Sequence, residues 1–228
     1  MTAREMQISF VTELSNIGKS VESSEMPGSD IIFYFINKAV EKFVKTRYSG
    51  MNSKGESFEQ TQKRIEDLRT LLSESTISTS TSTIKPNAYK ADLPNDYFIT
   101  ASEEVDIYFV KDSIPVTERQ GIKEITSDRY RHEIDNPFGG HILHYGLARP
   151  LRLYQGEDVL LISDGNYTIP TYYLRYIKYP AVVALPSTNC DLPNHTHSEI
   201  IKLAIGMFLE NTTDKRYGSY SNEINTME

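Results

Sequence analysis

The side chains best suited to chemistry gather in one short stretch near the C-terminus. His195, His197 and Glu199 alternate there, and Cys190 precedes them. Imidazole, thiolate and carboxylate groups bind tetrahedral zinc, which needs three or four ligands converging on one point. However, the two histidines stand two residues apart at the expected start of a helix, where side chains with that spacing do not face each other. A metal-dependent hydrolase is therefore kept as an alternative, and solvated or capping histidines are the simpler interpretation.

Other catalytic patterns are missing from the sequence. Cys190 is the only cysteine, which excludes an internal disulfide framework and a multi-cysteine zinc site. There is no G-x-S-x-G motif, no phosphate-binding P-loop and no G-x-G-x-x-G fingerprint. His132, His141 and His144 surround a Pro-Phe-Gly-Gly turn without a neighbouring nucleophile motif. We therefore predict that the chain is not an enzyme and binds no metal or cofactor.

The charge balance and the hydropathy of the chain exclude some classes of binding partner. The 228 residues include 24 Lys and Arg against 31 Asp and Glu, a formal net charge of −7. Because neutralising phosphates requires a surplus of cations, attraction of the whole protein to nucleic acid is not expected. The N-terminus has no apolar signal region, and no apolar run approaches the roughly 18 residues of a membrane helix. We therefore expect no membrane partner.

Tyrosines are the strongest candidates for contacts with other proteins. An expected strand over residues 172–179 interleaves aromatic and cationic side chains, a pattern that can stack on single-stranded nucleic acid. The acidic balance favours a strand with one tyrosine-lined packed face instead. The polar C-terminal tail holds two more tyrosines and should be loose in a free subunit. The candidate partner-binding residues are Tyr172, Tyr173, Tyr176, Tyr217 and Tyr220.

Helices are expected at both ends of the chain. Thr2 and Glu5 fit a capping box, and apolar residues with helical spacing follow from Met6 to Ile17. A second helix should start at Asp30 and a third at Ser57. Near the C-terminus, Thr196 and Glu199 fit a capping box before two apolar stripes. A helix that is apolar nearly all round must be covered on more than one side, and we expect Leu203 and Met207 in its core.

Strands are expected in the middle of the chain, with a short helix over residues 127–134. The clearest strands are residues 105–110, 149–154, 159–162 and 168–179. Asp164-Gly165 is typical of a type I′ turn and predicts a hairpin between the last two of these. Pro170 within the last strand indicates an edge position or a bulge.

This order of elements predicts a mixed α+β fold. A helical bundle from the N-terminal third and the C-terminal helix should carry an inserted, mainly antiparallel β-region. The expected segments are a helical part over 1–74, a Ser/Thr-rich linker over 75–91, a β-rich region over 92–190, and the C-terminal helix and tail over 191–228. Residues 91–228 should pack with 1–74, with a single domain as the alternative.

The Ser/Thr-rich tract over residues 73–83 is the best boundary within this plan. It is low in complexity and, as an isolated chain, should be flexible because it can bury almost nothing. The alternative is an extended strand, because threonine favours β geometry.

The order of several short motifs resembles that of tailed-phage virion proteins that join head to tail. The motifs are LPNDYF at residues 93–98, NPF at 136–138, YYLRYIKYP at 172–180 and CDLPNHTHSEII at 190–201. Residues from about Asp92 to Leu209 together resemble the connector or ring proteins of phages such as the crAss-like gut phages. The N-terminal third and the Ser/Thr tract lie outside this resemblance, which carries over no catalytic residue.

The resemblance implies a structural protein of the virion at the head–tail junction, assembled in the host cytoplasm. It implies a ring of twelve copies below the portal, in contact with the portal protein and with neighbouring connector or tail proteins. Double-stranded DNA would pass through transiently, and an acidic lumen would keep it from sticking. A tail-attached host-recognition module built on the β-region is a further alternative.

Overall fold

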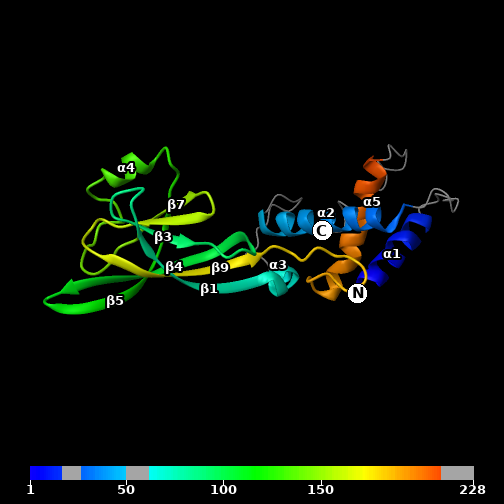
Figure 1. The fold of residues 1–228 in the computed structure, drawn as a ribbon, viewed down its shortest axis with the longest axis horizontal. Helices are drawn as coiled ribbons and strands as arrows, with labels where there is room; N and C mark the ends of the chain where they lie inside the picture. The colour runs from blue at the N-terminus through cyan, green and yellow to red at the C-terminus, as the bar shows by residue number, and fades with distance from the viewer. Residues whose placement is uncertain (17–26, 50–61, 212–228) are drawn as a thin grey trace. The chain divides into compact units, whose positions relative to one another are not determined.

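The structure, a computed structural model, describes residues 1–16, 27–49 and 62–211. The chain divides into two compact units, unit 1 with residues 1–71 and 179–228 and unit 2 with residues 72–178. Figure 1 shows that unit 1 is helical and that unit 2 holds the strands. The strands are thus inserted between two helical stretches, which confirms the expected mixed α+β fold. Within the described ranges, no helix has the length and apolar character needed to cross a bilayer.

Unit 1 is built from helices whose starts and faces follow the sequence. Its elements are α1 (Ala3–Asn16), α2 (Ser29–Ser49), α3 (Gln62–Leu68), the 3-10 turns η1 (Arg69–Leu71) and η2 (Asn194–Thr196), and α5 (His197–Asn211). The expected capping box opens α1, because the Thr2 N–H donates to Glu5 Oε2 at 2.9 Å and the Glu5 N–H donates to Thr2 Oγ1 at 3.2 Å. Ile17 and the expected helix start at Ser57 lie outside the described residues.

The core of unit 1 forms where α5 packs against α1 and α2. The Phe208 ring meets Phe10 of α1 and Phe35 of α2 edge to face, with ring centroids 6.0 and 5.5 Å apart. The expectation for α5 was wrong in one respect, because Leu203 and Met207 are only partly buried. The buried apolar side chains of this helix are Ile200, Ile201, Ala204, Ile205, Phe208 and Leu209.

Unit 2 contains two sheets. Sheet A has the order β1-β9-β4-β5 and is antiparallel throughout, with β1 (Leu72–Ser78), β4 (Tyr97–Lys111), β5 (Ile114–Gly121) and β9 (Thr168–Lys178). Sheet B has the order β2-β3-β8-β7-β6, with β2 (Ser80–Ser82), β3 (Ala88–Asp92), β6 (Lys123–Glu124), β7 (Leu151–Gln155) and β8 (Asp158–Ile162). Only the β6–β7 pair is parallel. The short helix α4 (Tyr130–Ile134) falls within the expected helix over residues 127–134.

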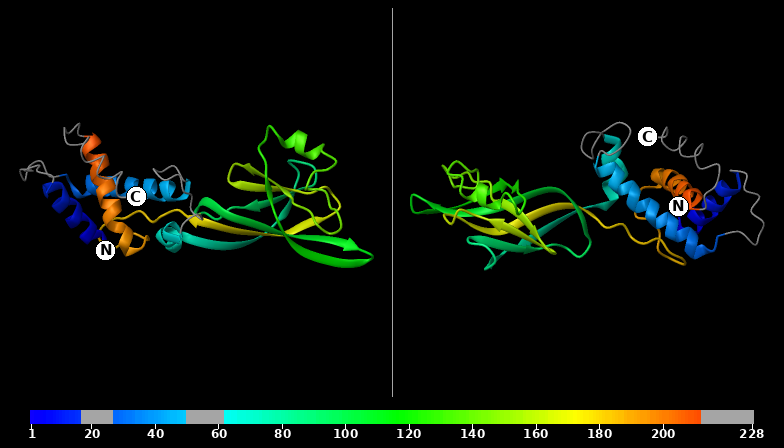
Figure 2. Two further views of the ribbon diagram at one scale, coloured as in Figure 1. Left: turned by 180° about the vertical axis from the view of Figure 1, so that it is seen from behind. Right: turned by 90° about the horizontal axis from the view of Figure 1, so that it is seen from above.

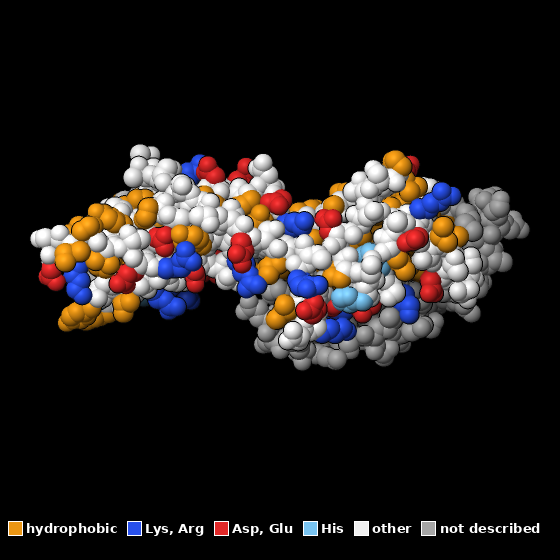
Figure 3. Space-filling view, turned by 90° about the horizontal axis from the view of Figure 1, so that it is seen from below, with side chains coloured by type: hydrophobic (Ala, Val, Ile, Leu, Met, Phe, Trp, Pro, Cys, Tyr) orange, Lys and Arg blue, Asp and Glu red, His pale blue; other side chains and the backbone are white. Residues whose placement is uncertain are grey.

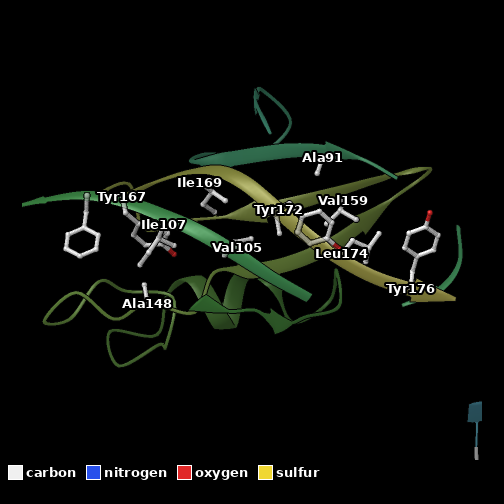
Figure 4. Packing of buried hydrophobic residues seen from close by; sticks show 12 residues of the cluster. Ala91, Val105, Ile107, Ala148, Val159, Tyr167, Ile169, Tyr172, Leu174 and Tyr176 are labelled. Carbon is white, nitrogen blue, oxygen red and sulfur yellow. The ribbon is translucent and has the colours of Figure 1, made fainter. Parts of the chain in front are cut away.

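The two sheets and α4 form three layers. Buried residues of both sheets, among them Val105, Tyr172 and Leu161, make one cluster between the sheets (Figure 4). A second cluster lies on the other face of sheet B, where Leu151, Leu160 and Tyr130 meet. Figure 2 shows α4 on the side of sheet B that faces away from sheet A. One face of sheet A is therefore left without a covering layer among the described residues of unit 2.

The Ser/Thr tract is strand rather than a flexible linker. Residues of β1 pair with β9 from Leu72↔Ile177 to Ser78↔Thr171, and β2 continues into sheet B. In β1, Glu74 and Thr76 are exposed and Ile77 packs against the inter-sheet cluster. The alternative of an extended strand is thus correct. Threonine favours β geometry, and a strand at the border of a sheet needs few apolar side chains such as Ile77.

The expected hairpin at Asp164-Gly165 does not form. β8 pairs with β3 and β7 in sheet B, whereas β9 pairs with β1 and β4 in sheet A. Gly165 still has a positive φ of 92°, but the turn carries the chain from one sheet to the other. The expected irregularity near Pro170 is present as a register shift between Asp106 and Tyr108 on the facing strand. Asp164 does not have a positive φ, so the expected type I′ turn is absent and the predicted partner strand was also wrong.

Candidate functional site

The three side chains of the alternative metal site each have a different partner. His195 Nε2 lies 2.9 Å from Asp67 Oδ1, and Glu199 Oε2 accepts a 2.5 Å bond from Arg47. His197 Nε2 donates to the Leu192 carbonyl at 2.9 Å. Burial lowers the pKa of the His197 imidazole, which favours this neutral, donating form. Among the described residues, no group of three His, Cys, Asp or Glu side chains is placed to hold a metal ion.

A buried arginine organises this part of unit 1. Arg47 on α2 is 3% exposed, and its Nε lies 3.0 Å from Asp67 Oδ2 on α3. Its Nη2 bonds Glu199 on α5, so one guanidinium joins three helices. The sequence offered no local pattern for this contact, because Asp67 and Glu199 lie far from Arg47 along the chain. Once Arg47 is buried, the bundle depends on both carboxylates, because an unpaired guanidinium in the interior is costly.

The single thiol is not activated. Cys190 is half-buried, and burial raises the pKa of its thiol. A thiolate nucleophile requires the opposite shift, from a neighbouring cation or a helix N-terminus. Cys190 is therefore suited to packing and not to covalent catalysis.

The tyrosines of β9 divide between the two faces of sheet A. Tyr172 and Tyr176 are 0% and 5% exposed and belong to the cluster between the sheets. Tyr173 points to the other face, where its hydroxyl donates to Asp106 Oδ2 at 2.8 Å and the Arg119 guanidinium stacks 3.7 Å from its ring. Within one copy, Tyr173 is therefore more accessible to a partner than the two core tyrosines. Tyr217 and Tyr220 lie outside the described residues.

A second buried polar cluster joins the two sheets of unit 2. Glu103 of sheet A accepts bonds from the Tyr172 hydroxyl at 2.5 Å and from Arg152 of sheet B at 3.1 Å. Arg152 also pairs with Glu124 at 2.8 Å and stacks over Tyr154. Burial raises the pKa of the Glu103 carboxyl, while its donors oppose that rise. Each side chain of the cluster has a partner, although Arg152 Nε has no hydrogen bond, and the Glu103–Arg152 pair connects the two sheets.

Unit 2 also presents large apolar side chains to solvent. Phe138 and Tyr145, in the segment between α4 and β7, are 91% and 96% exposed. Val110 and Ile114, next to the turn between β4 and β5, are also exposed. Figure 3 shows apolar side chains interspersed with charges of both signs on one face of this unit. Such surface suits protein contacts more than a small-molecule site.

Comparison with known proteins points in the same direction. A family model described as "Phage tail ring protein 3/4" matches residues 1–216, which include all of unit 2 and unit 1 except residues 217–228. The curated protein "Ring protein 4/5" of Bacteroides phage crAss001 is 25% identical over 220 residues, covering 86% of this chain and 89% of that protein. Both names describe ring proteins, and neither describes an enzyme.

Proposed function

The chain belongs to the phage tail ring protein 3/4 family, and we propose that its ring lies in the head-to-tail connector below the portal, where phage DNA passes through it. The protein is a structural ring component of a phage virion. The observation that carries the proposal is the family match over residues 1–216, because it takes in the helical unit as well as the inserted sheets.

A ring places particular demands on the surface of each copy. A closed cyclic assembly uses heterologous contacts, in which one face of a subunit meets a different face of the next. We propose twelve copies, with the portal protein on one side and neighbouring connector or tail proteins on the other. Tyr173 on sheet A, together with Tyr217 and Tyr220 of the tail, is proposed to contribute to these contacts.

The charge of the chain fits a passage for DNA and not a DNA clamp. Each copy carries a formal net charge of −7, so a ring of copies presents a surplus of acidic groups. Acidic surfaces repel the phosphates of a passing duplex, whereas proteins that hold DNA surround it with Lys and Arg.

A phage that lacks this protein tests the position in the virion. We expect DNA-filled heads without attached tails, and complementation with the intact chain should restore complete particles. Complete tailed particles that fail only to adsorb to the host would contradict the connector position and would favour the host-recognition alternative. The measurement is electron microscopy of purified particles, with an adsorption assay in parallel.

A further inference from the structure

Sheet A of unit 2 ends in two strands that pair on one side only within the described part of the chain. β1 pairs with β9 alone, and β5 pairs with β4 alone. A strand at the border of a sheet presents N–H and C=O groups that can pair with another chain. Both strands are long for border strands in this protein, since those of sheet B, β2 and β6, have three and two residues.

The turn between β4 and β5 fixes which groups of β5 face outward. Asp112 and Ser113 both have positive φ, of 50° and 65°, which is a two-residue type I′ geometry. Residues flanking such a turn exchange hydrogen bonds, and hydrogen-bonded pairs then alternate with pairs that are not. The backbone N–H groups of Thr117 and Arg119 therefore point away from β4. Pro115 occupies an equivalent position, where the missing N–H costs the hairpin nothing.

The outward groups of β1 follow from one bond just beyond its end. The Thr79 N–H donates to the Pro170 carbonyl at 3.1 Å, in the same register as the β1–β9 pairs. Odd-numbered residues of β1 thus bond β9, and the groups of Glu74, Thr76 and Ser78 face outward. The side chains of these three residues are exposed, as are those of Thr117 and Arg119 on β5.

We propose that β5 of one copy pairs antiparallel with β1 of the next copy, so that sheet A continues from subunit to subunit around the ring. The inference rests on the proposed ring assembly and names its contact. One register brings all outward groups together, with Leu72 opposite Gly121 and Ser78 opposite Pro115. That register matches the seven residues of β1 to seven of the eight residues of β5.

Side chains are complementary in the same register. Glu74 falls opposite Arg119, and these side chains are 80% and 53% exposed. Their ion pairs within the chain are long, at 3.6–3.8 Å, and Arg119 also stacks on the Tyr173 ring. On the other face, Ile77 falls opposite Val116, and both already pack against the inter-sheet cluster. Opposite charges and paired apolar residues are the cross-strand combinations that stabilise antiparallel sheets.

The direction of the strands permits a ring. Sheet A has four strands that alternate in direction, so β1 and β5 run antiparallel to each other. Antiparallel pairing of β5 with the next β1 then leaves every copy pointing the same way. Copies related by rotation alone satisfy this condition, and the contact is heterologous as a closed ring requires.

The stagger of the two border strands also fits closure. Within one copy, Leu72 pairs with Ile177, which pairs with Ile99 of β4. In the proposed register, Leu72 of the next copy faces Gly121, which pairs with Glu104. Because β4 has a register shift between Thr100 and Ser102, this stagger equals the four residues from Ile177 to Tyr173 on β9, about 13 Å along strands spaced about 4.8 Å apart. Over four strands this corresponds to a tilt of about 35°, at the lower end of the range of closed β-barrels.

Engineered disulfides test this pairing directly in virions. Thr76 and Thr117 would face each other across the contact at about 5.5 Å between Cα atoms, a distance that a disulfide spans. Within one copy, β9 and β4 separate their strands, so a bond can form only between copies. A chain with Thr76→Cys and Thr117→Cys, in a Cys190→Ser background, should give a ladder of multimers on a non-reducing gel. Each single variant, and the displaced pair Glu74→Cys with Thr117→Cys, should stay largely monomeric.

A proline substitution tests the β5–β1 pairing independently of the disulfides. Thr117→Pro removes an outward N–H without breaking the β4–β5 hairpin, as Pro115 already does two residues earlier. We expect the free subunit to melt near the parent temperature and its incorporation into particles to fall at least tenfold. Thr117→Ala, which removes the same side chain but keeps the N–H, should incorporate normally.

The outcomes separate this pairing from the proposed function. A ladder together with the proline block supports the pairing. Closed rings of the chain without a ladder, and with Thr117→Pro still incorporated, would overturn the pairing and leave the ring position standing. Virions in which the chain forms no closed ring would contradict both the strand pairing and the proposed function.

Discussion

At the scale of single residues, the buried arginines carry much of the specificity of each unit. Arg47 in unit 1 and Arg152 in unit 2 are each nearly inaccessible and each contact two carboxylates. Removing one partner from such a pair leaves an uncompensated charge in the interior, which costs more than the pair contributes. Both clusters are therefore sensitive points of the fold.

Asp67→Asn should lower the free energy of unfolding by about 3 kcal/mol. The reason is that Arg47, which is almost fully buried, would lose one of its two carboxylates. The matched control is Glu66→Gln in the same helix, whose partner Arg69 is exposed, and it should change stability by less than about 0.5 kcal/mol. Equal effects of the two variants in chemical denaturation would show that the Arg47 cluster does not support the bundle.

His197 makes the stability of unit 1 dependent on pH. Burial lowers the pKa of its imidazole in the folded chain, so the unfolded chain takes up a proton near pH 6.5 that the folded chain does not. The free energy of unfolding should therefore fall as the pH is lowered from about 7 to about 5. His197→Gln should remove this part of the dependence, and chemical denaturation at several pH values measures it. An unchanged slope in the variant would contradict the assignment.

At the scale of elements, α5 tests which face holds the bundle together. Ile205 is fully buried, whereas Leu203 is only partly buried. Ile205→Ala should cost about 2–5 kcal/mol through lost burial and the resulting cavity. Leu203→Ala on the same helix removes a side chain of the same size and should cost clearly less. Thermal or chemical denaturation of both variants checks this order, and a larger loss for Leu203→Ala would refute the assigned face.

Helices were predictable from the sequence, and strand partners were not. The apolar spacing of α1 and α2 reports directly on their buried faces, and the capping box of α1 is a local pattern. In contrast, the turn at Asp164-Gly165 says only that the chain reverses, because the partner of a strand depends on residues distant in sequence. The real β4–β5 hairpin was missed because its turn, Asp112-Ser113, has no glycine.

The candidate site residues also show that contacts between distant parts of the sequence were not predictable. In β9, Tyr172, Leu174 and Tyr176 share one face of a strand, and the apolar Leu174 between them could have marked that face as buried. Tyr173 could then have been separated from them by alternation alone. No comparable pattern exists for Arg47, since its partners Asp67 and Glu199 come from other helices.

At the scale of the whole molecule, the two units offer different kinds of surface for the assembly of a ring. Among the described residues, unit 2 has two sheet borders that pair with no further strand, with matching lengths and complementary charges. Unit 1 presents helices held by an apolar core and one buried ionic cluster. We propose that contacts above and below the ring also involve the polar tail, which lies outside the described residues.

Deleting residues 214–228 should separate folding from assembly. The segment is polar and by composition adds little to the core, so the melting temperature of the free subunit should be nearly unchanged. Complete tailed particles should fail to form from a complemented deletion, because Tyr217 and Tyr220 are lost. Unfolding of the truncated subunit would assign the tail to the core. A normal yield of particles would show that the tail makes no contact needed for assembly.

A cryo-electron microscopy reconstruction of the virion neck tests the proposed position most directly. We predict a closed ring of twelve copies of this chain between the portal and the tail, with a channel on its axis wide enough for double-stranded DNA. Density for the chain at the distal end of the tail, or in an assembly without a closed ring, would contradict that position.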